Sequence, residues 1–425
     1  MKKIVLCALF FSSLTILSPE PLLAKSVHKY NEQGIKYMET AEYFEAVSAF
    51  EEAYKLSAHN NTIKKNLTAA YFSLANNYAE KQDWEEAIKY AQKAYNLDNT
   101  NKDLAKNIAV LYNNYAYVLK QKDLTDSAYK KLCKALEYDK QSWVIYLSLG
   151  ALMYEQGRIN AARKYWAKAV EINPGLTNIK QQLARLEKES TVEDKFHKKY
   201  YGKFEVKYEG YEKDDLAWKV LDILNEAHYK LGYDFQYYPN NKITIIIYTK
   251  EQFQDITQRP EWIRGMFDGI IRVTAADIEG AKGELKNTLY HEYTHALLYH
   301  KTRNNIPKWL NEGLAQYKEP RKDFFRPGEL KILKKHIADD SLIMVDKLDQ
   351  AFLDQQDKDL LMLAYLESKL LIKYLDERHG FYQIRYILDK LSKGDDIDTA
   401  LKETIYDDTK RLEQEWRNWL KRKYM

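Results

Sequence analysis

The chain has 425 residues, of which 45% are hydrophobic and 30% are charged, and its formal net charge is +4. These values describe an ordinary soluble protein with two or three domains and enough apolar residues to build a core. Basic residues alternate with acidic ones along the chain instead of forming a stripe, which excludes the electrostatic footprint of a nucleic-acid-binding protein.

Residues 1–24 have the three parts of a secretory signal peptide. Met1-Lys2-Lys3 is basic, residues 4–17 are mostly apolar, and the stretch after them ends at the small residue Ala24. The apolar run is short for a membrane span, so we expect cleavage after Ala24, with an uncleaved anchor as the alternative. No later run is long enough to cross a bilayer. The sequence thus predicts an exported chain, periplasmic or extracellular, without a span in its mature part.

The next segment repeats a pattern of small residues. Each of four units carries two alanines seven residues apart: Ala46 and Ala53, Ala87 and Ala94, Ala128 and Ala135, Ala162 and Ala169. This spacing predicts four helical hairpins, because only a small side chain lets two helices approach closely at these points. The steps between units are 41, 41 and 34 residues. The extra seven residues, about two helical turns, indicate either longer helices or a longer loop.

The repeated pattern resembles tetratricopeptide repeats, whose usual period is 34 residues. Pro174 closes the fourth unit as that family's proline does, and residues 177–189 predict the amphipathic helix that caps such arrays. The resemblance implies an all-α solenoid over residues 25–190, with four repeats and a capping helix. Its concave surface would bind a protein partner.

Residues 191–201 are polar and basic and are expected to form a linker to a second domain over residues 202–425. Residues 203–208 alternate as a half-buried strand, residues 214–231 have helical spacing, and the β-branched run 243–248 predicts a strand buried on both faces. A further strand is expected over residues 265–273. Its free edge, at Phe267, Asp268 and Gly269, is a candidate to pair with an extended peptide substrate.

His291-Glu292-Tyr293-Thr294-His295 is the first candidate for chemistry. Residues four apart share one helix face, so both imidazoles can turn toward one point. A catalytic zinc site takes three protein ligands and leaves one position open. Glu312, on a second predicted helix that begins at Pro307, is the expected third ligand. Glu292 lies beside the open position and is the candidate general base.

The stretch from Lys308 to Tyr317, KWLNEGLAQY, is similar to the glutamate-bearing helix of gluzincin metallopeptidases, in particular the aminopeptidase N-like branch and bacterial peptidase MA-like domains. The similarity covers roughly residues 200–425. It implies an α+β gluzincin-like domain with a helical C-terminal part and one Zn²⁺ ion. The resemblance makes His291, His295 and Glu312 the zinc ligands and Glu292 the base.

Further roles follow from the same resemblance. Tyr365 lies in a segment that looks like the aminopeptidase helix whose tyrosine hydrogen-bonds the developing oxyanion, although a packing tyrosine is an equal alternative. Gln316 stands four residues after Glu312, where some gluzincins have a carboxylate that orients a ligand histidine, and Asn311 is a second candidate to support the ligands. The aminopeptidases bind a free amine with a strand glutamate, but this chain has Asp268 in that region, so an endopeptidase is favoured.

The sequence as a whole predicts an exported zinc metallopeptidase whose repeats recruit a peptide or protein substrate. The competing hypothesis is a non-catalytic repeat scaffold that binds a protein partner and keeps a vestigial metallopeptidase domain.

Overall fold

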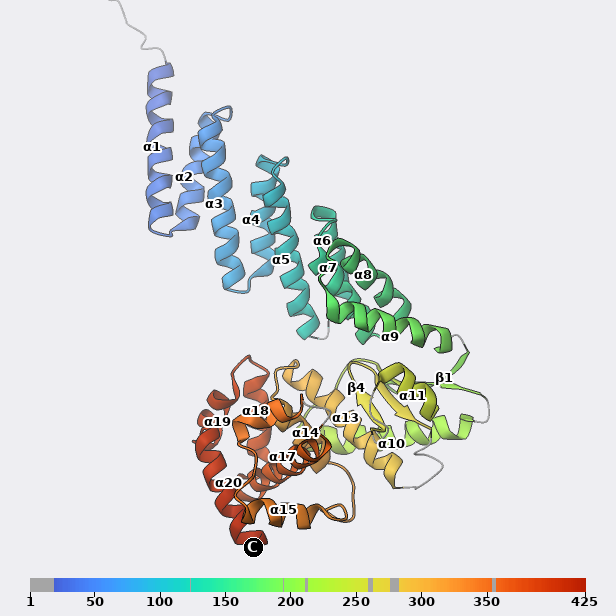
Figure 1. Cartoon of the computed structure of the whole chain (residues 1–425). Helices are drawn as coiled ribbons and strands as arrows, with labels where there is room; N and C mark the ends of the chain where they lie inside the picture. The colour runs from blue at the N-terminus through green and yellow to red at the C-terminus, as the bar shows by residue number, and fades with distance from the viewer. Residues whose placement is uncertain are drawn as a thin grey trace, which may run out of the picture. The chain divides into compact units, whose positions relative to one another are not determined.

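The computed structural model describes residues 19–425 apart from residues 123, 194, 211–212, 259–262, 276–282 and 354–356. The chain divides into two compact units, Met1–Ile145 and Tyr146–Met425 (Figure 1). The expected signal peptide lies mostly outside the described residues, and the first helix runs across the expected cleavage point after Ala24. None of the described helices is long and apolar enough to span a membrane.

The first unit is built of antiparallel helical hairpins, as the repeat pattern predicts. Its helices are α1 (Pro19–Glu39), α2 (Tyr43–Leu56), α3 (Asn61–Glu80), α4 (Trp84–Leu97), α5 (Lys102–Gln121) and α6 (Thr125–Tyr138). Helices α3 and α5 have 20 residues each, whereas α7 (Trp143–Glu155), the corresponding helix of the fourth hairpin, has 13. The extra seven residues of the longer repeats therefore lengthen a helix, which settles the alternative that the sequence left open.

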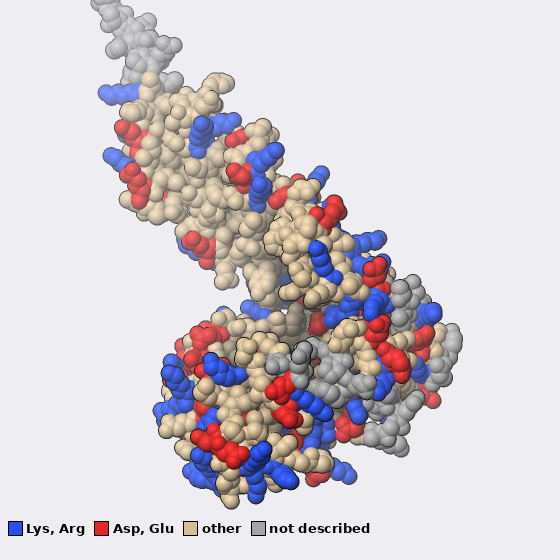
Figure 2. All heavy atoms as spheres, in the orientation of Figure 1, with Lys and Arg blue, Asp and Glu red and all other residues tan. Residues whose placement is uncertain are grey.

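Close approach between paired helices explains the small residues. Ala46, Ala87 and Ala128 are buried, and a Cβ atom added to Gly34 would lie 2.6 Å from the ring of Phe50. Figure 2 shows acidic and basic groups interleaved on the visible face. The first unit is thus held together by its alanine-lined helix contacts.

The second unit contains a five-stranded sheet in the order β1-β2-β3-β5-β4. Its strands are β1 (Phe196–Tyr201), β2 (Phe204–Glu209), β3 (Ile243–Tyr248), β4 (Gly265–Phe267) and β5 (Ile271–Thr274). Strands β2, β3 and β5 are parallel, while β1 and β4 pair antiparallel at the two edges.

Two parts of this sheet differ from the sequence-based expectation. Strand β1 occupies most of the expected linker 191–201, because Gly202 (φ 57°) turns the chain into a hairpin with β2 and Phe196 packs on Tyr248. The single strand expected over residues 265–273 is a hairpin of β4 and β5, which turns at Gly269 (φ 107°).

Helices cover both faces of the sheet, so β3 is buried along its whole length as its sequence predicts. On one face, alternate residues such as Ile245 and Ile247 join a core formed with α10 (Asp214–Phe235) and α13 (Glu284–Thr302). The opposite face meets the capping helix α9 (Thr177–Glu193) and the turn after α7, where a Cβ atom added to Gly157 would lie 2.5 Å from Thr244 of β3. On this face the Tyr248 hydroxyl donates to Glu189 of α9 over 3.0 Å. Helix α8 (Ile159–Ile172) completes the fourth hairpin and packs on α9.

A buried ionic network joins the β4–β5 hairpin to the fourth repeat. The Arg272 guanidinium, with a fully buried side chain, pairs with Glu189 and with Asp268, both at 2.5 Å. Tyr154 of α7 donates its hydroxyl hydrogen to Asp268 over 2.8 Å, and Arg185 of α9 pairs with the same carboxylate. Burial alone would raise the pKa of Asp268, but the two arginines outweigh burial and hold this pKa below its usual range. The carboxylate is therefore charged and fully engaged.

The rest of the second unit is helical. Helix α14 (Lys308–Tyr317) packs on α17 (Lys358–His379), and Leu412, Trp416 and Leu420 of the last helix are fully buried in the same core. The other helices are α11 (Lys250–Thr257), α15 (Glu329–Ala338), α16 (Leu348–Ala351), α18 (Phe381–Leu391), α19 (Ile397–Ile405) and α20 (Thr409–Tyr424). The sheet and this helical layer enclose α13 between them.

The ionic network predicts a stability cost for removing its buried carboxylate. We expect Glu189→Gln to lower the free energy of unfolding of the second unit by about 3 kcal/mol, because the Arg272 charge stays buried after one of its two carboxylate partners is lost. Glu187→Gln, an exposed change on the same helix, should cost less than about 1 kcal/mol. Urea unfolding of the full chain measures both. Equal values for the two variants would contradict a structural role for the network.

Candidate metal centre

Two neighbouring helices bring His291, His295 and Glu312 together. The Nε2 atoms of the histidines are 3.1 Å apart, and Glu312 Oε2 lies 3.4 Å from His295 Nε2 and 3.6 Å from His291 Nε2. Among the described residues, this is the group of three histidine, cysteine or acidic side chains whose ligand atoms converge, all within 4.8 Å. The two-element motif of the sequence therefore forms one site.

The spacing of these atoms fits a zinc ion. Ligand atoms about 2.0–2.1 Å from a tetrahedral zinc lie roughly 3.3 Å from one another, close to the three separations found here. Glu312 Oε2 is also buried without a hydrogen-bond partner. A buried, unsatisfied carboxylate oxygen is costly unless something else completes its contacts. The donor set and the orphaned oxygen together accommodate a metal.

Each histidine is oriented by a hydrogen bond at its other ring nitrogen. His295 Nδ1 lies 2.9 Å from Asn311 Oδ1, and His291 Nδ1 lies 3.0 Å from Glu319 Oε1. When Nδ1 donates to these oxygens, Nε2 carries the lone pair that a metal needs. Asn311 is thus one of the two residues expected to support the ligands.

The carboxylate that supports His291 is Glu319, not Gln316 as the resemblance implied. Helix α14 ends at Tyr317, so Glu319 leaves the helical path and returns toward His291. Helical spacing cannot predict such a contact. The available signal was Pro320, because the residue before a proline is disfavoured in a helix.

Burial and neighbouring charges shift the pKa values of the cluster in opposite directions. Burial lowers the pKa of His291, but the nearby carboxylates of Glu312 and Glu319 outweigh burial and raise this pKa to about 10. Burial acts to raise the pKa of Glu312, yet His295 and His291 hold it far below its usual range. The pKa of Glu292 is raised, mainly by burial. Glu292 thus binds a proton more readily than an exposed glutamate does.

Glu292 lies against the edge strand of the sheet. A Cβ atom added to Gly265 of β4 would be 2.5 Å from Glu292 Oε1 and 2.8 Å from its Cγ. The absence of a side chain at position 265 therefore lets the backbone of β4 pass directly over the candidate base. Sequence spacing gave no sign of this contact, since 27 positions separate the two residues.

The other residues expected at the substrate edge face the scaffold. Asp268 is held by Arg272, Arg185 and Tyr154, and a Cβ atom added to Gly269 would lie 3.5 Å from the Tyr154 ring. Phe267 packs on Tyr299 of α13 in an edge-to-face contact. The Asp268 carboxylate therefore stabilises the β4–β5 turn. The side chains of the expected edge are occupied in this way, and the backbone of β4 is left as the candidate substrate contact.

Tyr365 lies on α17, the helix that packs behind the ligand helix. A Cβ atom added to Gly313 of α14 would meet the backbone oxygen of Ser368 at 2.6 Å, so these helices approach closely one residue after Glu312. The Tyr365 ring makes an edge-to-face contact with Phe352 at 5.0 Å. Its expected role at the oxyanion stays a prediction.

Comparison with known families agrees with this division of the chain. Residues 224–422 match the Peptidase MA superfamily, and residues 68–101 match the tetratricopeptide repeat. The chain therefore carries a Peptidase MA superfamily domain, which includes all the proposed metal ligands, and at least one tetratricopeptide repeat.

Solved structures with similar parts include MamA (TM-score 0.26, 19% identity, covering 40% of this chain and 86% of that one) and Pseudomonas aeruginosa PilF (TM-score 0.23, 18% identity, covering 40% and 72%). Likenesses at this level carry no argument about function. A search of curated proteins finds no significant match.

The geometry predicts which side chain supports the metal through His291. We expect Glu319→Gln to weaken zinc affinity about 10- to 100-fold, because the charged acceptor of the His291 Nδ1 hydrogen bond is lost. Gln316→Ala should change zinc affinity less than about threefold, because the His291 Nδ1 contact is made by Glu319. Competition with a chromophoric chelator measures both. Equal losses in the two variants would contradict the assignment of Glu319.

Proposed function

We propose that the protein is an exported zinc-dependent metallopeptidase of the gluzincin type. The observation that carries the proposal is the convergence of His291, His295 and Glu312, with Glu292 beside them on the same helix as the histidines. The Peptidase MA superfamily match over residues 224–422 supports a peptidase. The repeats, which match a family of protein-interaction modules, would recruit the protein substrate.

Zinc bound by these three residues would activate a water molecule and polarise a peptide carbonyl. Glu292, on the same helix as both histidines, would accept a proton of that water and then pass it to the leaving amine. Glu319 and Asn311 keep both histidines turned toward the centre. Tyr365 is proposed to donate a hydrogen bond to the oxyanion.

Endopeptidase action is favoured over aminopeptidase action. An aminopeptidase needs a carboxylate beside the metal to hold the free amine of its substrate. The nearest candidate on the hairpin, Asp268, is bound by Arg272 and Arg185. The edge of β4 offers backbone groups instead, and these would bind an extended chain on either side of the cleaved bond.

Metal content and one substitution test the proposal. We expect about one zinc per chain in purified protein, and at least about 100-fold slower peptide hydrolysis in Glu292→Gln with zinc retained, because the variant lacks the proton acceptor. Zinc analysis and cleavage of a peptide library, with blocked and free amino termini, measure these outcomes. Absence of stoichiometric zinc, or equal cleavage by both proteins, would favour the non-catalytic scaffold.

A second variant tests the contact between β4 and the base. Gly265→Ala places a methyl group where Glu292 lies, so we expect hydrolysis about 100-fold slower with zinc content unchanged. Gly283→Ala is the matched control, since a Cβ atom there meets nothing within 4 Å. If Gly265→Ala cleaves peptides as fast as the control, Glu292 does not act from the position described.

A further inference from the structure

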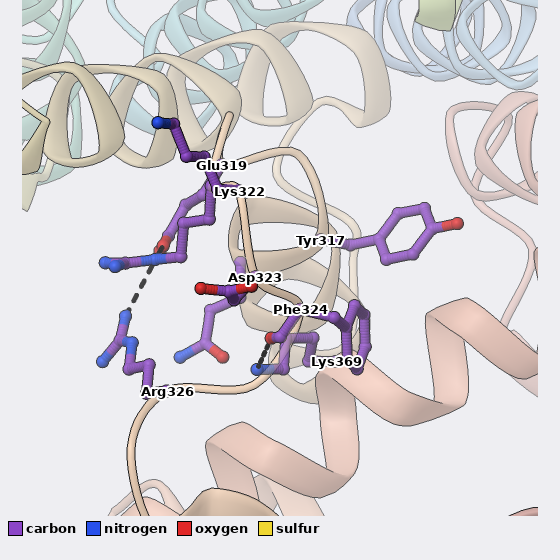
Figure 3. A pocket seen from close by; sticks show the side chains of 9 residues that line it. Tyr317, Glu319, Lys322, Asp323, Phe324, Arg326 and Lys369 are labelled. Carbon is purple, nitrogen blue, oxygen red and sulfur yellow. Dashed lines mark hydrogen bonds and ion pairs between the residues drawn. The ribbon is translucent and has the colours of Figure 1, made fainter.

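A small charged pocket shares one residue, Glu319, with the surroundings of the metal centre. It lies after the C-terminal end of α14 and has a volume of about 180 Å³. Four of its lining residues are cationic, Arg321, Lys322, Arg326 and Lys369, and two are acidic, Glu319 and Asp323 (Figure 3). Pockets that enclose a whole small molecule measure roughly 300–1,000 Å³. This pocket is smaller and fits a single side chain or a chain end.

Two of the four cations are held in place by carboxylates. Lys369 pairs with Glu329 at 2.7 Å and donates to the backbone oxygen of Phe324 at 2.9 Å. Arg321 pairs with Glu319 and, at 3.2 Å, with Glu284. These contacts build rigid walls and neutralise the two charges locally.

The other two cations keep unused hydrogen-bond donors. The Arg326 guanidinium lies 3.5 Å from Glu319 and 3.9 Å from Glu329, beyond the usual length of a hydrogen bond. Lys322 lines the same pocket with an exposed side chain, and no ion pair of this lysine is found among the described residues. A guanidinium fork and an ammonium group at one pocket are well suited to a carboxylate, since charge-assisted hydrogen bonds are the strong ones.

The pocket is linked to the proposed reaction centre through one side chain. Glu319 Oε1 lies 3.0 Å from His291 Nδ1, and the same carboxylate pairs with Arg321 and faces Arg326 in the pocket wall. A group bound at Arg326 is therefore separated from a metal ligand only by Glu319. A charge bound there would therefore act on His291 through Glu319, at the ring nitrogen that does not face the metal.

We propose that this pocket is a specificity subsite that binds a carboxylate of the peptide substrate through Arg326 and Lys322. The inference rests on the proposed peptidase function. The carboxylate has two sources, an acidic side chain or the C-terminus of the substrate. Asp323, at the same pocket, would disfavour a second negative charge and so limits the site to one carboxylate.

Paired peptides test the subsite with the zinc-loaded full chain. A cleaved sequence from a peptide library is resynthesised with Glu or Gln at each flanking position, and with a C-terminal acid or amide. We expect kcat/KM about tenfold higher for the acidic member at one position, as one charge-assisted hydrogen bond gives. A preference confined to the acid/amide pair identifies the C-terminus as the source.

Arg326→Gln and Lys322→Gln should bring that acidic-to-neutral ratio close to about one, whereas the exposed control Arg422→Gln should keep it. Zinc content of each variant checks that the site is intact. No acidic preference in the wild type, or a preference that survives both substitutions together, overturns the subsite.

A binding measurement separates this result from failure of the proposed function. Zinc-loaded Glu292→Gln, which retains the pocket, is equilibrated with the same library, and bound peptides are identified by mass spectrometry. We expect acidic peptides to be enriched about tenfold over their amide counterparts, with the enrichment lost when Arg326→Gln is added. If neither the wild type nor Glu292→Gln cleaves any peptide but this enrichment is found, catalysis is rejected and the subsite is kept. Equal recovery of both classes rejects the subsite.

Discussion

The candidate metal centre depends on the position of one short helix. Helix α14 must present Glu312 to two histidines of α13 while the next residue, Gly313, touches the backbone of α17 at Ser368. A side chain at position 313 would push α14 away from α17 or toward the histidines. Since ligand geometry tolerates only a few tenths of an ångström, this backbone contact sets how accurately the third ligand is placed.

The fourth repeat contributes to the same geometry from the other side of the sheet. Its residue Tyr154, with Arg185 and Glu189 of the capping helix, holds Asp268 and Arg272 of the β4–β5 hairpin. That hairpin in turn lies over Glu292 at Gly265. Interactions of the last hairpin with the sheet therefore limit the freedom of the strand beside the base.

Local patterns predicted much of this protein, and contacts between distant residues account for what they missed. The repeat helices, the buried strand β3 and the pair His291 and His295 follow from spacing along single helices or strands, and Glu312 follows from the similarity of its helix to that of gluzincins. Glu319 was missed because the chain leaves the helix before reaching it. The pairing of Asp268 with Arg185 joins residues 83 positions apart, and nothing in either segment indicates that partner. Residues 191–201, expected to be a linker, contain the edge strand β1. This strand forms by pairing with β2, a contact that the polar sequence of the segment does not indicate.

The attachment of the last hairpin to the sheet also divides the array into parts that can evolve at different rates. Whole hairpins that precede Ile145 belong to the first compact unit, and solenoids add or lose such units one at a time because each contacts only its neighbours. Duplication or deletion there leaves Arg272 and its partners intact. The fourth hairpin lacks that freedom, since its loss would uncover a buried charge. Array length can therefore drift among descendants of this chain, whereas the identity of its final repeat is constrained by the domain that follows it.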